Sequence, residues 1–166
     1  MKMREIRIEK IVINVGIKPD EKVENPIKIL EELTGCKPVP TKSKKRSTFN
    51  VPKGRTLGCK VTIRKNQYEL LKRLLNARDN KLLGSNFDET GNFCFGVEEY
   101  ITVPGMKYNP YIGMFGFDVC VSLERPGFRV KRRKVKSKIG KKHLITKKEA
   151  IEFVKKTFGT EVMEDA

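Results

Sequence analysis

Two stretches of this chain carry many basic residues and no acidic residue, and this segregation constrains the fold more than any other feature. Residues 33–68 contain ten Lys or Arg side chains, and residues 125–148 contain twelve. The rest of the chain has 14 basic and 20 acidic residues. A solvated protein face usually mixes both signs, and a polyanionic partner would relieve the repulsion of a net charge of +16. The pattern favours a slightly acidic body that carries two basic segments for phosphate contacts.

Alternating apolar residues predict the strands of that body. Residues 6–17, 59–65, 93–100 and 116–124 each follow a period of two, and the prolines near residue 39 allow only an edge strand there. The apolar side of each strand faces the core. The other face of the sheet is therefore predicted to carry Asn14, Lys60, Thr62 and Arg64.

Three helices are predicted from apolar spacing and from end signals. The first begins at Asn25-Pro26 and ends at Gly35. Asn66 with Glu69, and Thr146 with Glu149, have the spacing of capping boxes. The second helix is expected to have an apolar stripe of Tyr68, Leu71, Leu74, Leu75 and Leu82, and the third one of Ile151, Val154 and Phe158.

Together these elements predict an α+β fold, with a mainly antiparallel sheet and helices packed on one of its faces. A long basic loop, residues 41–58, is expected between two strands, and a basic arm, residues 125–148, is expected to lead to the final helix. The whole chain, 1–166, is predicted to be one RNA-binding domain. The loop before residue 116 is apolar and is expected to pack on the body or on a partner.

The sequence contains no signature of an enzyme. It has no P-loop and no GxGxxG motif, and its one histidine, His143, lies between lysines and Leu144. The four cysteines, at 36, 59, 94 and 120, lack metal-site spacing, so we expect reduced and mostly buried thiols and no cofactor. No apolar run reaches the roughly 18 residues of a membrane span, and the first ten residues do not resemble a secretory signal. We expect a cytoplasmic protein.

The basic loop has one bulky aromatic side chain, Phe49, among the cations Lys42, Lys44, Lys45, Arg46, Lys53 and Arg55. An aromatic ring in such a setting can stack on an unpaired base while the cations hold phosphates. It can equally fold back and anchor the loop on the core. The sequence alone leaves both roles open.

Several long segments resemble the ribosomal protein L5 family, in its archaeal and eukaryotic branch. They are IEKIVINVGI, LTGCKPVPTKSKKRSTFNVPKGRTLGCKVTIRKNQYELLKRLL, YIGMFGFDVCVSLERPGFRVKRRK and SKIGKKHLITKKEAIEFV. The resemblance implies a protein that binds 5S rRNA through the exposed sheet face, with the family's binding Asn, Thr and Phe at Asn14, Thr62 and Phe49. A bacterial Gln of the family has no match, because Cys36 stands there.

The resemblance implies further partners. The basic loop would contact P-site tRNA, and residues 100–115 are a candidate position for a bridge to a protein of the small-subunit head. Neighbouring 5S-associated ribosomal proteins are expected as well. The arm would hold large-subunit rRNA, and its candidate contacts are Arg129, Lys131, Arg132, Arg133 and Lys134.

Three other classes of function stay open on the residues alone. An RNA chaperone or RNA-modifying enzyme would need an active centre that the sequence does not reveal. A DNA-compacting protein would bind duplex DNA as well as RNA. A membrane-surface protein ranks last, because the basic segments form no amphipathic helix with one basic face.

Overall fold

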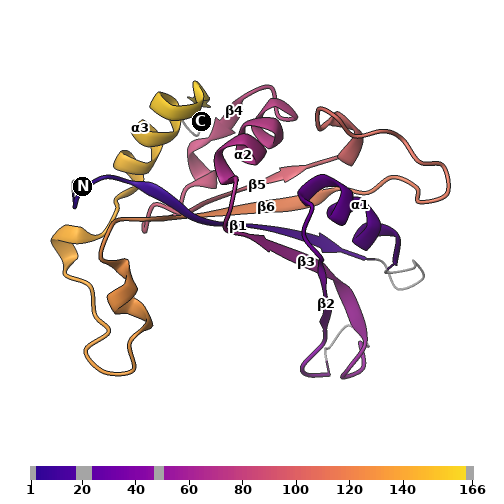
Figure 1. Ribbon diagram of the computed structural model, residues 1–166, viewed down its shortest axis with the longest axis horizontal. Coiled ribbons are helices and arrows are strands. Elements are labelled where there is room, and N and C mark those ends of the chain that lie inside the picture. The colour runs from indigo at the N-terminus through magenta and orange to yellow at the C-terminus, as the bar shows by residue number, and fades with distance from the viewer. Residues whose placement is uncertain (1–2, 18–23, 47–50, 164–166) are drawn as a thin grey trace.

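A five-stranded antiparallel sheet forms the centre of the molecule, in the computed structural model that describes residues 3–17, 24–46 and 51–163 (Figure 1). The strands lie in the order β2-β3-β1-β6-β5, so the first strand of the chain is the middle one. Their bounds are β1 Arg7–Gly16, β2 Val39–Lys42, β3 Thr56–Ile63, β5 Phe93–Val97 and β6 Phe117–Glu124.

All three helices lie on one side of this sheet, which confirms the predicted α+β class (Figure 1). They are α1 (Glu24–Thr34), α2 (Gln67–Asn76) and α3 (Lys147–Phe158). Alternate residues of the strands point toward them. Ile11 and Ile13 of β1, for example, have no exposed surface, and neither has Leu71 of α2. Burial of these side chains is the main force that holds the helix layer on the sheet.

The helix ends follow the sequence signals in part. Gly35 ends α1 with a φ of 64°, and Thr146 and Glu149 form the capping box predicted for α3. Helix α1 starts at Glu24, so Asn25 lies in its first turn instead of capping it, and the Asn25 amide donates to the Ile112 carbonyl at 3.4 Å.

The start of α2 differs from the prediction. Asn66 adopts a left-handed conformation with a φ of 51° and makes no side-chain cap, so the expected capping box is wrong. Gln67 is buried instead and donates to the Glu9 carbonyl at 2.9 Å. Tyr68 is 45% exposed and stacks on Phe158, with 6.1 Å between the ring centres, and it therefore does not belong to the apolar stripe.

Leu82 also lies outside α2. It is buried in β4 (Lys81–Leu83), which pairs in parallel with β7 (Glu161–Met163) as a second sheet of two strands. Neither strand of this pair was predicted from the sequence, because three residues are too few for a period of two to be recognised. The pair follows α2 and α3 in the chain and joins the ends of these two helices.

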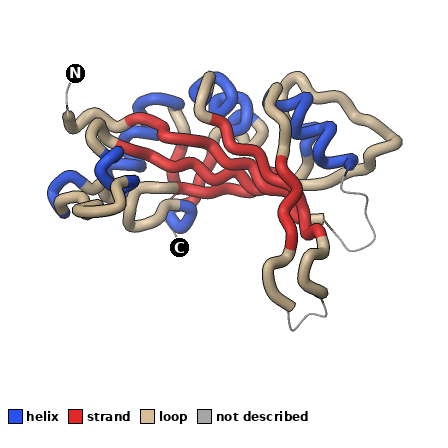
Figure 2. The backbone as a smooth tube through the Cα atoms, turned by 60° about the horizontal axis from the view of Figure 1, so that its bottom comes forward, coloured by secondary structure: helices blue, strands red, loops and turns tan. Residues whose placement is uncertain are grey.

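None of the described α-helices covers the other face of the sheet (Figure 2). Two segments project on this side, at opposite ends of the molecule (Figure 1). One is the hairpin of β2 and β3, whose connecting residues 43–55 we call the hairpin loop. The strands include both ends of the predicted loop 41–58, so that prediction was too long. The other projection is the arm, residues 125–148.

Candidate nucleic-acid interface

Three of the predicted residues lie together on the uncovered face of the sheet, which we call the open face. In the strand register Asn14 of β1 is opposite Lys60 of β3, and Val12 is opposite Thr62. Directly opposed residues of an antiparallel pair point to the same face. The next predicted residue, Arg64, is exposed and follows β3 directly.

Three polar side chains of the open face have no partners inside the part of the chain that the structure describes. No hydrogen bond or ion pair is formed there by the side chains of Asn14, Lys60 or Thr62. Asn14 and Lys60 are exposed, and Thr62 is half-buried. Their donors and acceptors are therefore directed at solvent or at a bound molecule.

Two cysteines extend this face toward the opposite edge of the sheet. Cys120 of β6 is paired with Val12 and, on its other side, with Cys94 of β5. Partial desolvation by neighbouring groups and the contact with Cys120 raise the pKa of Cys94 to about 12, so the thiol stays neutral at physiological pH. A neutral Cys94 thiol does not repel phosphates.

The prediction of mostly buried thiols is wrong for two of the four. Cys94 and Cys36 are exposed, and Cys59 alone is fully buried. Burial raises the pKa of Cys59 to about 11.

The arm is a folded loop whose two ends are tied together. The Arg125 side chain is 5% exposed, and its guanidinium donates to the carbonyls of His143 and Leu144 and to the Glu149 carboxylate, the last at 2.7 Å. His143 Nε2 lies 2.9 Å from the Pro126 carbonyl, and its ring packs edge-on against Phe128. The arm therefore has a defined shape before any ligand binds.

Short 3-10 helices, Phe128–Arg132 and Lys141–His143, shape the arm and present its cations. Arg132 pairs with Glu9 of β1, which ties the arm to the end of the sheet. No ion pair within the described residues involves the other predicted contacts of the arm, and all of these are exposed: Arg129, Lys131, Arg133 and Lys134.

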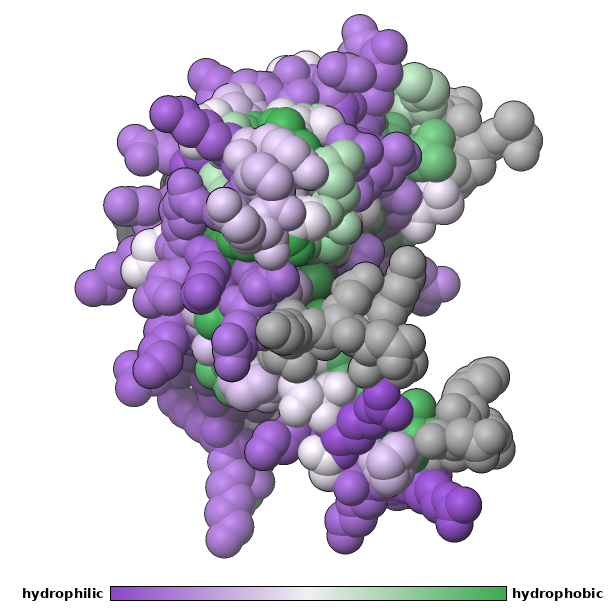
Figure 3. Space-filling model, turned by 90° about the vertical axis from the view of Figure 1, so that its right-hand side faces the viewer, coloured by the Kyte–Doolittle hydropathy of each residue, from purple (hydrophilic) through white to green (hydrophobic). Residues whose placement is uncertain are grey.

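The hairpin loop presents the second set of cations. Backbone hydrogen bonds between Ser43 and Arg55 (2.8 Å) and between Gly54 and Ser43 (2.9 Å) continue the pairing of β2 and β3 beyond the sheet. All predicted cations of this hairpin are exposed: Lys42, Lys44, Lys45, Arg46, Lys53 and Arg55. Phe49 lies outside the described residues. At this end of the molecule hydrophilic side chains cover most of the surface (Figure 3).

The predicted residues thus form three separate groups on one side of the molecule: the hairpin, the open face and the arm (Figure 1). A flat polar surface with a cationic projection at each end suits a bulky polyanion better than a small molecule. Among the described residues, no group of three His, Cys, Asp or Glu side chains is placed to hold a metal ion. None of the described helices has the length and apolar character to span a membrane.

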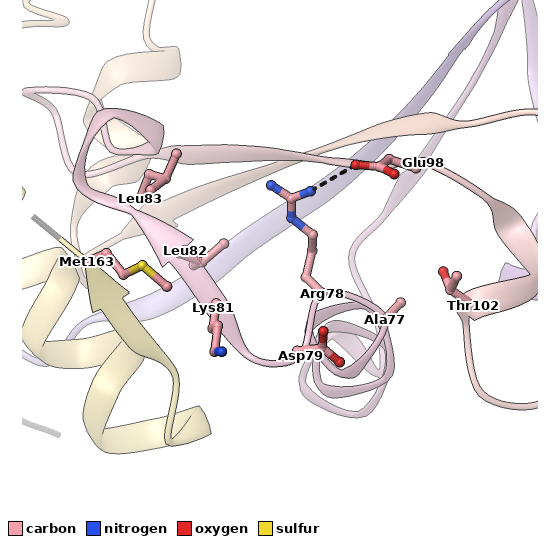
Figure 4. Close-up of a pocket in the computed structure, with 9 residues that line it drawn as sticks. All are labelled: Ala77, Arg78, Asp79, Lys81, Leu82, Leu83, Glu98, Thr102 and Met163. Atoms are coloured by element: carbon pink, nitrogen blue, oxygen red, sulfur yellow. Dashed lines mark ion pairs between the residues drawn. The ribbon is translucent and has the colours of Figure 1, made fainter. Parts of the chain in front are cut away.

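Three charged residues at the edge of the open face were not predicted from the sequence. Asp118 of β6 is directly opposite Asn14 and is exposed. Beyond it, Arg78 extends from the end of α2 toward Glu98, with 3.7 Å between charged atoms (Figure 4). An acidic residue in a strand gives no sequence signal of RNA contact, so only the register could place Asp118 beside Asn14.

The apolar loop between β5 and β6 is only partly packed on the body. Tyr100 is fully buried and stacks on Phe115, and its hydroxyl accepts from the backbone of Asn109 at 3.1 Å. Tyr111 in contrast is 92% exposed, and Tyr108 and Met114 are more than half exposed. The loop therefore has an anchored base and an apolar tip that is open to solvent.

Comparison with known proteins gives one consistent family. The sequence pattern for the C-terminus of the ribosomal L5 family matches residues 56–153, and that of Ribosomal protein L5 matches residues 2–49. The large ribosomal subunit protein uL5 of Pyrobaculum aerophilum is 45% identical over 164 residues, which cover 96% of this chain and 92% of that protein. The proteins of the same name from Methanococcus maripaludis and Nanoarchaeum equitans are 45% and 43% identical, over 98% and 97% of this chain and 94% and 98% of theirs.

Proposed function

This chain belongs to the ribosomal protein L5 family, and from that premise we propose that it binds 5S rRNA as a non-catalytic constituent of the large ribosomal subunit in the cytoplasm. The observation that carries the proposal is the open face, where Asn14, Lys60 and Thr62 have no side-chain partner among the described residues and which has a basic projection at each end. We propose that the whole chain, residues 1–166, forms a single RNA-binding domain.

The open face would hold 5S rRNA. Asn14 and Thr62 offer hydrogen bonds, and Lys60 and Arg64 offer phosphate contacts at the same surface. RNA is recognised largely by shape and by a few polar and stacking contacts, which a rigid sheet can provide. Phe49, the stacking residue that the family likeness implies, falls outside the described residues.

The arm would bind large-subunit rRNA and so fix the 5S particle in the central protuberance. Its exposed cations project from a loop that Arg125 closes. A preformed loop loses little conformational entropy on binding, which favours a permanent structural contact.

The hairpin loop would contact P-site tRNA. Its lysines and arginines offer phosphate contacts, which do not depend on sequence and therefore accept every tRNA. Its position at the opposite end of the molecule from the arm leaves it available while the arm is bound to rRNA (Figure 1).

The tip of the loop between β5 and β6 is our candidate for the bridge to a protein of the small-subunit head. Its exposed Tyr108, Tyr111 and Met114 belong to the residue types that are enriched in protein–protein interfaces. Other 5S-associated ribosomal proteins would be its neighbours within the large subunit.

A binding titration tests the proposal. The purified protein is titrated with 5S rRNA at several salt concentrations, with bulk tRNA and duplex DNA of similar length as competitors. We expect a preference for 5S rRNA that persists as salt rises, because shape-specific contacts are less sensitive to salt than phosphate contacts. Equal and salt-labile binding to all three would contradict the proposal and favour an RNA chaperone or a DNA-compacting protein. Turnover of RNA would point to an enzyme.

A further inference from the structure

A carboxylate, that of Asp118, lies on the surface that we assign to RNA. Asn14 has Lys60 on one side and Asp118 on the other, so a cation, an amide and a carboxylate form one row across three strands. Asp118 forms no hydrogen bond or ion pair with another described residue. On a face that contacts phosphates a carboxylate weakens binding, unless it makes a specific contact that offsets the repulsion.

Beside this row the surface is hollowed. Asn14 and Asp118 border an open depression of about 370 Å³, lined also by Gly16, Gly96 and Gly116. These glycines leave bare backbone where side chains would otherwise stand. A Cβ atom at Gly96 would lie 3.6 Å from Asp118 Oδ1, so any larger side chain there would crowd the carboxylate.

Arg78 and Glu98 line the same depression, and their charged groups face each other. Figure 4 shows the guanidinium of Arg78 crossing from α2 to the end of β5. A guanidinium group that lines a depression can stack on an aromatic ring that is bound in the depression.

The hydrogen-bonding groups of Asp118 and Asn14 favour guanine over the other three bases. A carboxylate accepts two parallel N–H donors, as it does from arginine. On its Watson–Crick edge guanine presents N1–H and the N2 amine side by side, whereas adenine, cytosine and uracil each present one donor group there. The guanine O6 acceptor on the same edge matches the Asn14 amide, which can donate.

We propose that this depression holds an unpaired guanine base of the bound RNA. The Asp118 carboxylate accepts from guanine N1–H and N2–H, Asn14 donates to O6, and Lys60 binds a phosphate that adjoins the base. The proposal rests on the proposed function, because RNA has to lie on the open face. It adds a base-reading role for an acidic residue to that function.

The substitution Asp118→Asn separates the two possible effects of this carboxylate by sign. It keeps the shape of the side chain and removes one negative charge. If Asp118 only repels phosphates, the variant binds 5S rRNA more tightly. If Asp118 reads guanine, the variant binds about tenfold more weakly, because an amide group replaces one acceptor with a donor.

The matched control is Glu152→Gln, which removes the same charge from an exposed position of α3 on the helix side. We expect its affinity for 5S rRNA to equal that of the unchanged protein or to exceed it slightly. Equal or tighter binding by D118N than by E152Q overturns the proposal. Thermal unfolding of both variants verifies that each is folded at the assay temperature.

Inosine substitution in the RNA locates the base. Inosine lacks the N2 amine, so replacing the bound guanosine should weaken binding severalfold with the unchanged protein and not with D118N. Single inosines are placed at the unpaired guanosines of 5S rRNA, one per transcript. Equal penalties for both proteins at every position contradict the assignment.

These measurements keep the two proposals distinguishable. If the unchanged protein shows no preference for 5S rRNA over tRNA and duplex DNA, the proposed function fails. If that preference is present and D118N binds as well as the unchanged protein, the guanine assignment alone fails.

Discussion

The Arg125 guanidinium and the Glu149 carboxylate lie 2.7 Å apart, and they join the end of β6 to the first turn of α3 across the entire arm. Glu149 also accepts from the backbone of Thr146 at 3.0 Å, so one carboxylate both caps the helix and closes the arm. This pair is therefore a central contact that holds the two ends of the arm together.

Replacing Arg125 with Met should loosen the arm while apolar packing is preserved. We expect a loss of about 1–3 kcal/mol in the free energy of unfolding, since the guanidinium is buried and Glu149 remains partly hydrated. Urea denaturation measures the loss, and limited trypsin digestion should cut the arm faster. Glu149→Gln serves as a comparison, because glutamine retains the capping hydrogen bond without the charge. An arm as resistant to trypsin as before would contradict the role of the pair.

The stability of the protein should depend on the ionisation of Glu149. The Thr146 backbone N–H and the Arg125 guanidinium hold the pKa of this carboxyl below its ordinary value of 4.5. Its contribution is therefore fully present above pH 4.5 and is lost as the pH falls through the lower value of the folded state. Urea denaturation between pH 6 and pH 3 should give a steeper loss for the unchanged protein than for E149Q. If the free energies of unfolding of the two proteins fall in parallel with pH, the ionisation of Glu149 does not contribute to stability.

Gly58 should be intolerant of any side chain. A Cβ atom there would collide with the carbonyl oxygen of Val15 on the neighbouring strand. Gly58→Ala should therefore push β3 away from β1 and cost about 1–3 kcal/mol of stability. Gly16, opposite Gly58 in the register, has no atom within 4 Å of its Cβ position. Gly16→Ala is thus the matched control, and a chemical melt that finds both variants equally stable would refute the expectation.

Bulky apolar substitutions on the open face should reduce affinity for 5S rRNA and leave the fold intact. Asn14→Leu or Thr62→Leu removes polar groups that face away from the core. We expect at least a tenfold loss of affinity, from two lost or blocked hydrogen bonds. Thr157→Leu, at an exposed position of α3, is the control in the same titration. Unchanged affinity in both open-face variants would remove these residues from the site.

Neutralising Lys44, Lys45 and Arg46 to Gln should weaken tRNA binding and spare 5S rRNA. Each phosphate contact that is lost lowers the slope of log affinity against log salt by about 0.7–0.9. The control is the triple change of Lys131, Arg133 and Lys134 to Gln in the arm, which should leave tRNA binding unaffected. A steep fall of 5S rRNA binding in the hairpin variant would show that the hairpin also binds 5S rRNA, and that tRNA and 5S rRNA are not bound by separate surfaces as proposed.

The sequence predicted the sheet and its faces because period two is a direct consequence of strand geometry. The alternation of Ile11, Ile13 and Val15 with Asn14 was sufficient to place Asn14 and Thr62 on the same side, as the register confirms. The capping box of Thr146 and Glu149 was likewise predicted correctly, because the motif is local.

The features that the sequence could not predict depend on contacts between distant residues. Asn66 and Glu69 have capping-box spacing, but a buried Gln67 that bonds to Glu9 fixes the start of α2 in another geometry. The depression beside Asp118 arises from glycines of three different strands or loops. No local pattern records either arrangement, and the roles of all predicted contact residues stay predictions until binding is measured.

The central position of β1 has a consequence for the synthesis of the chain. Ile13 is paired with Val61 of β3 on one side and with Val119 of β6 on the other. The second edge of β1 therefore stays unpaired until β6, about a hundred residues later in the chain, has been synthesised. Until that strand is made, the nascent chain exposes an unsatisfied strand edge, which is a template for aggregation. Closure of such a distant pair is also slow. The growing chain therefore has a vulnerable period that ends only when β6 has been made, and a factor that shields β1 would be most useful before then.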